Sequence, residues 1–61
     1  INQKIRVGDR VRGVRLRKWD IVEGVVRRVN RLSLGIELDD GQVCLVYPDA
    51  ELVEPNQDAI Q

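Results

Sequence analysis

Histidine, methionine and phenylalanine are absent from this 61-residue chain, and cysteine, tryptophan and tyrosine each occur once. One cysteine, Cys44, cannot close an internal disulfide, and without histidine it cannot complete a zinc site of ordinary ligand count. We therefore expect no metal, no cofactor and a reducing, cytosolic setting. Catalysis needs a positioned base or nucleophile, and Cys44, Tyr47 and the carboxylates are the only candidates. We expect a chain that is not an enzyme and takes no small-molecule substrate.

Long apolar runs are absent as well, since a membrane segment needs about 18 or more consecutive apolar residues. We expect no membrane contact. The chain starts without methionine and without a basic-then-apolar leader, which favours an excised domain over a signal peptide. Its length allows one domain at most. The expected organisation is a lead-in at residues 1–4, a domain at 5–54 and a flexible tail at 55–61.

Basic residues are missing from the second half of the chain. All ten Lys and Arg lie in residues 1–31, where only three acids accompany them, and residues 32–61 carry seven acids. The two halves therefore have formal charges of +7 and −7, which cancel. This division predicts either two oppositely charged faces or two halves that pair with each other.

The strongest local signal is Asp40-Gly41, which lies between two alternating apolar runs. Such a dipeptide predicts a β-hairpin with a two-residue type I′ turn. The register that follows pairs Leu38 with Val43, Ile36 with Leu45, and Leu34 with Tyr47. On the opposite side, Glu37 faces Cys44 and Gly35 faces Val46, so the outer side of the second strand is apolar.

Residues 10–17 predict a strand with an irregularity at Gly13. Arginines occupy even positions before this glycine and odd positions after it. A β-bulge at Gly13 would restore the phase, because glycine tolerates the extra residue. Val11, Val14 and Leu16 would then point inward. The four arginines that would point outward are Arg10, Arg12, Arg15 and Arg17.

The remaining elements are short. A β-branched run predicts a strand at 21–29 with Val26 inward and a bend near Gly24, and further strands are expected at 32–38 and 52–54. Pro48 and the three residues after it predict a single 3₁₀ turn. No stretch has helical periodicity over ten residues. The predicted fold class is all-β: a five-stranded antiparallel SH3-like barrel with one 3₁₀ turn before the last strand.

Several segments resemble the Tudor, KOW and related SH3-like small barrels. They are residues 7–11 (Val-Gly-Asp-Arg-Val), Trp19 at the end of the first loop, residues 24–26, residues 39–41 and residues 47–52. The resemblance covers residues 5–54 and implies a fold rather than a function. Tudor domains often bind methylated lysine or arginine in a cage of three or four aromatic residues. This chain offers only Trp19 and Tyr47, so we expect no complete cage.

The plasmid-type (type II) dihydrofolate reductases are also SH3-like barrels, and two segments are similar to them. These are residues 8–12 (Gly-Asp-Arg-Val-Arg) and the pattern of Tyr47, Pro48, Ala50 and Leu52. That family uses a Val-Gln-Ile-Tyr segment and a lysine after its Gly-Asp-Arg-Val-Arg run. Residues 44–47 here read Cys-Leu-Val-Tyr, and Gly13 occupies the lysine position. The activity is therefore a distant alternative.

The cations of the first half suggest a binding function. Guanidinium groups neutralise phosphates, and an exposed aromatic ring beside them can stack on a base. We therefore predict a nucleic-acid-binding face made of Arg10, Arg12, Arg15, Arg17, Lys18, Trp19, Arg27 and Arg28. The alternative is a solvated face whose arginines pair with Glu37, Asp49, Glu51 and Glu54. The net charge of zero favours this alternative slightly.

A protein contact is the second predicted function. Cys44 and Val46 would form an exposed apolar strip on the predicted outer side of their strand, and we add Tyr47 to this expected interface. Such a strip fits a protein partner or a homo-oligomer in which the oppositely charged halves meet between subunits. The functional prediction is therefore a non-catalytic binding module, with nucleic acid as first choice and a protein partner or self-assembly as second.

Overall fold

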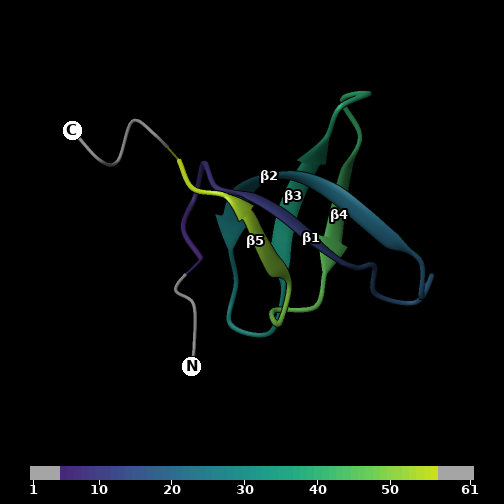
Figure 1. The fold of residues 1–61 in the computed structure, drawn as a ribbon. Helices are drawn as coiled ribbons and strands as arrows, with labels where there is room; N and C mark the ends of the chain where they lie inside the picture. Colours follow the sequence, from purple (N-terminus) through teal and green to yellow (C-terminus); the bar gives the residue numbers. More distant parts are fainter. Residues whose placement is uncertain (1–4, 57–61) are drawn as a thin grey trace.

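The computed structural model describes residues 5–56, and this segment contains five β-strands (Figure 1). They are β1 (Arg10–Val14), β2 (Ile21–Val29), β3 (Leu34–Leu38), β4 (Val43–Val46) and β5 (Glu51–Glu54). No helix occurs between residues 5 and 56, so the prediction of an all-β chain is confirmed. The expected lead-in at 1–4 and residues 57–61 of the expected tail lie outside the described residues.

The strands form one antiparallel sheet in the order β4-β3-β2-β1-β5. Consecutive strands from β1 to β4 are neighbours, and β5 returns to pair with β1. The sheet curls through the long strand β2, so that β4 approaches the end of β1 (Figure 1). Arg15 and Val46 form a single antiparallel bridge there, and the Tyr47 amide donates to the Val14 carbonyl at 3.0 Å. No continuous ladder between the described strands closes the sheet into a barrel.

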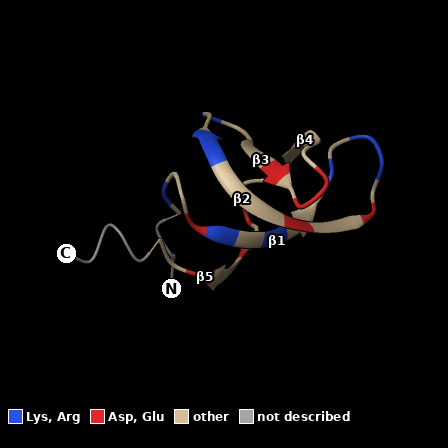
Figure 2. Cartoon of the chain, turned by 90° about the horizontal axis from the view of Figure 1, so that it is seen from above, with Lys and Arg blue, Asp and Glu red and all other residues tan. Residues whose placement is uncertain are grey.

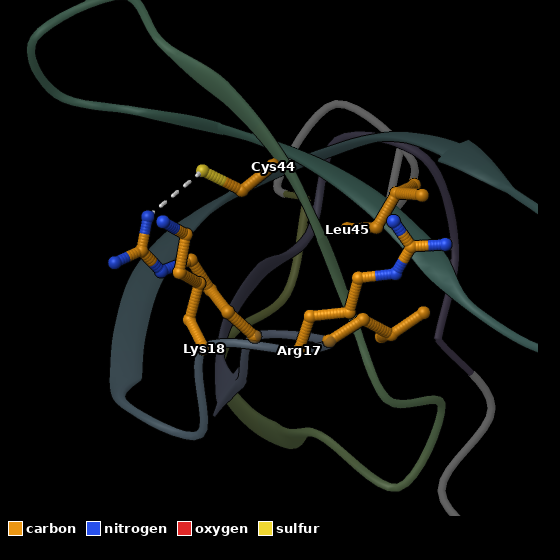
Figure 3. Close-up of a pocket in the computed structure, with 6 residues that line it drawn as sticks. Arg17, Lys18, Cys44 and Leu45 are labelled. Atoms are coloured by element: carbon orange, nitrogen blue, oxygen red, sulfur yellow. Dashed lines mark hydrogen bonds between the residues drawn. The ribbon is translucent and has the colours of Figure 1, made fainter.

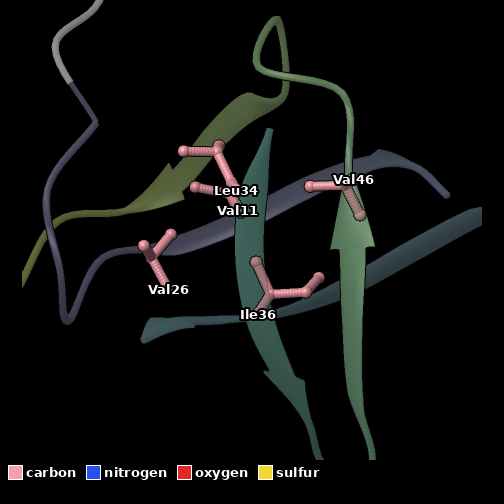
Figure 4. Close-up of a cluster of buried hydrophobic side chains, with 5 residues drawn as sticks. All are labelled: Val11, Val26, Leu34, Ile36 and Val46. Carbon is pink, nitrogen blue, oxygen red and sulfur yellow. The ribbon is translucent and has the colours of Figure 1, made fainter. Parts of the chain in front are cut away.

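The core fills the inner side of this curl (Figure 4). Its buried side chains come from β1, β2, β3 and β4: Val11, Val26, Leu34, Ile36 and Val46. Burying an aliphatic side chain of this kind stabilises the fold by about 1.5–3 kcal/mol. The inward orientation predicted for Val11 and Val26 is confirmed.

A buried carboxylate fastens both ends of the described segment to the sheet. Asp9 is 5% exposed, and its oxygens accept hydrogen bonds from the Arg6 amide at 2.9 Å and the Asn56 amide at 2.7 Å. The neighbouring backbone joins β2, because the Gly8 amide donates to the Val26 carbonyl at 2.7 Å. Gly8 has a φ of +97°, which glycine adopts without strain. Val7 and Gly8 form a turn before β1, closed by a hydrogen bond from the Asp9 amide to the Arg6 carbonyl at 3.1 Å.

The predicted register of the β3–β4 hairpin is wrong by one residue. Leu38 accepts a hydrogen bond from the Gly41 amide at 2.9 Å and donates its own amide to the Gln42 carbonyl at 2.7 Å. Gly41 has a φ of +89°, whereas Asp40 does not have a positive φ. Residues 39–41 thus form a three-residue loop, in which a type I turn is followed by a left-handed glycine.

This loop shifts every pair in the hairpin. The pairs are Leu34 with Val46, Gly35 with Leu45, Ile36 with Cys44, and Glu37 with Val43. Because side chains alternate along a strand, a shift of one residue moves the whole of β4 to the opposite face. Val46 is therefore in the core, while Val43 and Leu45 are exposed.

The predicted bulge at Gly13 is also wrong. β1 pairs with β2 without interruption from Arg10 to Val14, and the irregularities lie between Arg10 and Val11 against β5 and between Val26 and Arg28 against β3. Gly13 is buried because β1 packs closely against the side chains of Val46 and Ala50. A Cβ at this position would lie 2.8 Å from the Ala50 Cβ.

The segment before β5 also differs from the prediction. Pro48 and Asp49 form a turn and not the expected 3₁₀ turn, and β5 begins at Glu51. Within residues 5–56 there is no helix long and apolar enough to cross a membrane.

Candidate nucleic-acid interface

The two arginines of β1 lie on the outer face of the sheet, where carboxylates neutralise them. Arg12 is directly opposite Glu23 in β2, and its Nη2 lies 3.2 Å from the Glu23 Oε1. Arg10 bonds to Glu23 and, at 3.1 Å, to Asp39. The hydrogen bond to Asp39, followed by that to Glu23, raises the pKa of Arg10. The hydrogen bonds that Glu23 accepts from Arg10 and Arg12 lower the pKa of its carboxyl group.

Two further arginines of the predicted face are paired. Both ends of the Arg15 guanidinium bond to Asp20, with Nε at 2.7 Å from Oδ1, and this contact raises the pKa of Arg15 and lowers that of Asp20. Arg27 donates to Glu37 at 2.9 Å. The alternative of an internally paired face therefore describes Arg10, Arg12, Arg15 and Arg27.

The pairing acids are only partly those expected. Glu37 and Glu51 were expected, and Arg12 reaches Glu51 at 3.7 Å. Glu23, Asp20 and Asp39 were not. The position of Glu23 directly opposite Arg12 follows from the β1–β2 pairing.

The loop between β1 and β2, residues 15–20, presents three more residues of the predicted face to solvent. Arg17 and Trp19 have φ values of +70° and +65°, which lie in a backbone region that residues other than glycine rarely adopt. The loop is nevertheless ordered by hydrogen bonds from the Arg15 amide to the Asp20 carbonyl and from the Trp19 amide to the Arg15 carbonyl. Arg17, Lys18 and Trp19 are exposed, Trp19 to 72%.

The loop cations surround a hollow against the edge of β4, which we call the cationic hollow (Figure 3). Its lining residues are Arg15, Leu16, Arg17, Lys18, Cys44 and Leu45, and its volume is about 400 Å³. Arg17 and Lys18 extend from the loop on either side of this space (Figure 3). Within residues 5–56, neither of them forms an ion pair.

A second hollow lies on the Trp19 side of the same loop, and we call it the aromatic hollow. Its lining residues are Val14, Trp19, Ile21, Tyr47 and Asp49, and its volume is about 490 Å³. The ring centroids of Trp19 and Tyr47 are 5.6 Å apart, with the planes tilted by 32°. The predicted register puts Tyr47 opposite Leu34, so the contact between Tyr47 and Trp19 was not expected.

The predicted protein-contact strip needs correction. Val46 is fully buried and Cys44 is half-buried, because both lie on the inner side of β4. The Arg15 guanidinium donates to the Cys44 Sγ at 4.0 Å. The exposed apolar residues of β4 are instead Val43 and Leu45, with exposures of 68% and 48%.

The basic residues do not form one continuous face. Figure 2 shows Lys and Arg on β1, at the end of β2 and in the β1–β2 loop, with Asp and Glu between these places. Arg28 is exposed near the end of β2 and, in the described part of the chain, has no ion pair. The structure thus brings together Arg15, Arg17, Lys18 and Trp19, and leaves Arg10, Arg12, Arg27 and Arg28 elsewhere.

We also compared the chain with known proteins. Neither the protein-family models, nor the curated proteins, nor the solved structures gave a significant match.

Proposed function

We propose that the chain is an SH3-like small barrel and a non-catalytic module that binds single-stranded nucleic acid through its β1–β2 loop. The fold proposal is supported by the strand order and by the bridge between Arg15 and Val46. The functional proposal is carried by one observation. The loop cations Arg17 and Lys18 form no ion pair within residues 5–56 and lie beside an exposed tryptophan, whereas the strand arginines Arg10, Arg12 and Arg27 are paired.

Paired and unpaired cations differ in the free-energy cost of binding a phosphate. The guanidinium of Arg10 or Arg12 would have to give up its bonds to Glu23 before it could bind a new anion. Arg17 and Lys18 have no ion pair within residues 5–56 to give up, although the charge of Lys18 contributes after Arg15 to the lowered pKa of Asp20. Binding a phosphate also releases the counterions condensed on the nucleic acid. Trp19 follows them directly and can stack on an unpaired base, which favours single strands over duplexes.

Trp19 also supplies the measurement, because it is the only tryptophan of the chain. We expect its fluorescence to be quenched when a mixed-sequence DNA oligonucleotide of eight nucleotides is added in low salt. The double variant Arg17→Ala/Lys18→Ala should bind at least about tenfold more weakly, since each lost phosphate contact removes counterion release.

The matched control is Arg10→Ala/Arg12→Ala, which removes the same amount of positive charge from β1. Its affinity should stay within about threefold of the parent chain, because these arginines are already neutralised by carboxylates. Circular dichroism checks that both variants are folded. Equal losses in the two variants would show non-specific attraction to positive charge, and no quenching in low salt would remove the proposed function.

Self-association through β4 is a second candidate. Val43 and Leu45 are exposed on the same side of the strand. The Val43 end lies next to Glu37 and the acidic loop at 39–40, whereas Leu45 shares the cationic hollow with the loop cations. If two copies met antiparallel along β4, the acidic Val43 end of one strand would face the basic Leu45 end of the other. This charge complementarity favours a second copy of the chain as the partner.

Sedimentation velocity tests this candidate. A dimer should form in low salt and dissociate as salt is added, since its charge pairs would be exposed and screened. Val43→Asp should abolish the dimer by placing a charge in its centre. Val53→Asp, at a residue of β5 that is 40% exposed, is the control and should leave it intact. A chain that is monomeric at high concentration in low salt would exclude this candidate.

A further inference from the structure

The aromatic hollow has an uneven lining. Four of its five lining residues present apolar or ring surface, and the fifth, Asp49, is an exposed carboxylate. A volume of about 490 Å³ exceeds what one nucleobase needs and lies within the usual range of small-ligand pockets. The cationic hollow lies on the other part of the same loop, residues 15–18. One loop thus contributes positive charge to one hollow and a stacking surface to the other.

We propose that the aromatic hollow is a base-binding subsite in which Asp49 selects guanine. This inference rests on the proposed function, because it assigns a base to the site whose phosphates the loop cations bind. A carboxylate only accepts hydrogen bonds, so it favours a base edge that presents donors. Stacking on Trp19 and Tyr47 would bring that edge toward Asp49 at the rim of the hollow.

The four bases differ in what their Watson–Crick edges present to a carboxylate. Guanine has two adjacent donors, N1–H and the N2 amino group, which match the two oxygens of Asp49. Adenine and cytosine have one exocyclic amino group each. Thymine and uracil have a single N3–H between two carbonyl oxygens, which a carboxylate repels. The expected order of affinity is therefore guanine first, adenine and cytosine next, and thymine or uracil last.

The test compares two DNA oligonucleotides of eight nucleotides, one of thymidine only and one with a single central guanosine. Guanine offers the carboxylate of Asp49 one more hydrogen-bond donor than thymine does, so we expect the guanosine oligonucleotide to bind about tenfold more tightly. Trp19 fluorescence reports both titrations.

Asp49→Asn is the diagnostic variant because the amide keeps the size of the side chain. Its affinity for the two oligonucleotides should become equal, and its affinity for the thymidine oligonucleotide should not decrease. Glu51→Gln, which removes one acid outside the aromatic hollow, is the matched control and should keep the preference for guanosine.

The outcomes separate the two proposals. Equal binding of both oligonucleotides by the parent chain would overturn the guanine assignment and leave the proposed function standing. Absence of binding to either would overturn the proposed function. A preference that persists in Asp49→Asn would show that another group selects the base.

Discussion

A Gly24→Ala variant is expected to lose about 3 kcal/mol or more of its free energy of unfolding. A Cβ at this position would lie 2.4 Å from the carbonyl oxygen of Glu37, in the neighbouring strand β3. A backbone oxygen cannot rotate away as a side chain can, so β2 and β3 would have to separate. Overpacking usually costs about 1–3 kcal/mol and occasionally more, and we expect the upper part of this range or above. A chain of this size has a total stability of roughly 3–9 kcal/mol.

Gly35→Ala is the matched control for this prediction. It lies in β3, and the nearest atom to an added Cβ there is the Arg28 Cβ at 3.5 Å, an ordinary contact. Urea unfolding followed by circular dichroism should therefore give a midpoint close to that of the parent chain for Gly35→Ala and a much lower one for Gly24→Ala. Similar midpoints for the two variants would contradict the close approach of β2 and β3.

The second large effect concerns the face of β4. Val46→Asp should unfold the chain, because Val46 is fully buried and the new carboxylate would have no partner in an aliphatic core. Leu45→Asp should cost less than about 1 kcal/mol, since Leu45 is 48% exposed and surface substitutions have small effects.

Thermal unfolding of the two aspartate variants tests the hairpin register directly. A two-residue turn at Asp40-Gly41 would place Leu45 inside and Val46 outside, and the order of stabilities would then be reversed. A folded Val46→Asp protein would therefore contradict the observed register.

The sequence predicted the hairpin but not its register, for a physical reason. Asp40-Gly41 suits both a two-residue type I′ turn and a three-residue loop that ends in a left-handed glycine. The alternation of polar and apolar residues in the following strand normally distinguishes the two turns, because it shows which residues face the core. Residues 43–47 are apolar at every position, so β4 carries no such signal.

The strand boundaries were predictable where β-branched residues cluster. The predicted strand at 21–29 coincides with β2, and Val26 points inward as expected. The phase of residues 10–17 was misinterpreted, because β1 ends at Val14 and the later arginines belong to a loop. Glycine is needed at position 13 because the backbone there lies close to the side chain of Ala50, a residue distant in the sequence.

The candidate site was predictable in part. The resemblance to SH3-like barrels placed Trp19 at the end of the first loop, and the structure has it in the β1–β2 loop. The sequence did not indicate that Tyr47 would join Trp19, because this contact depends on the register of β4. The pairing of Arg12 with Glu23 follows once β1 and β2 are aligned, so the neutralisation of Arg12 is a consequence of the fold and not of composition.

The most direct test of the proposed function is the salt dependence of oligonucleotide binding by the parent chain and by Arg17→Ala/Lys18→Ala. For two phosphates of a single strand, the logarithm of the association constant should fall against the logarithm of salt concentration with a slope of about −1.4. The double variant should show a slope near zero. A slope that is the same in both proteins would contradict binding through the β1–β2 loop.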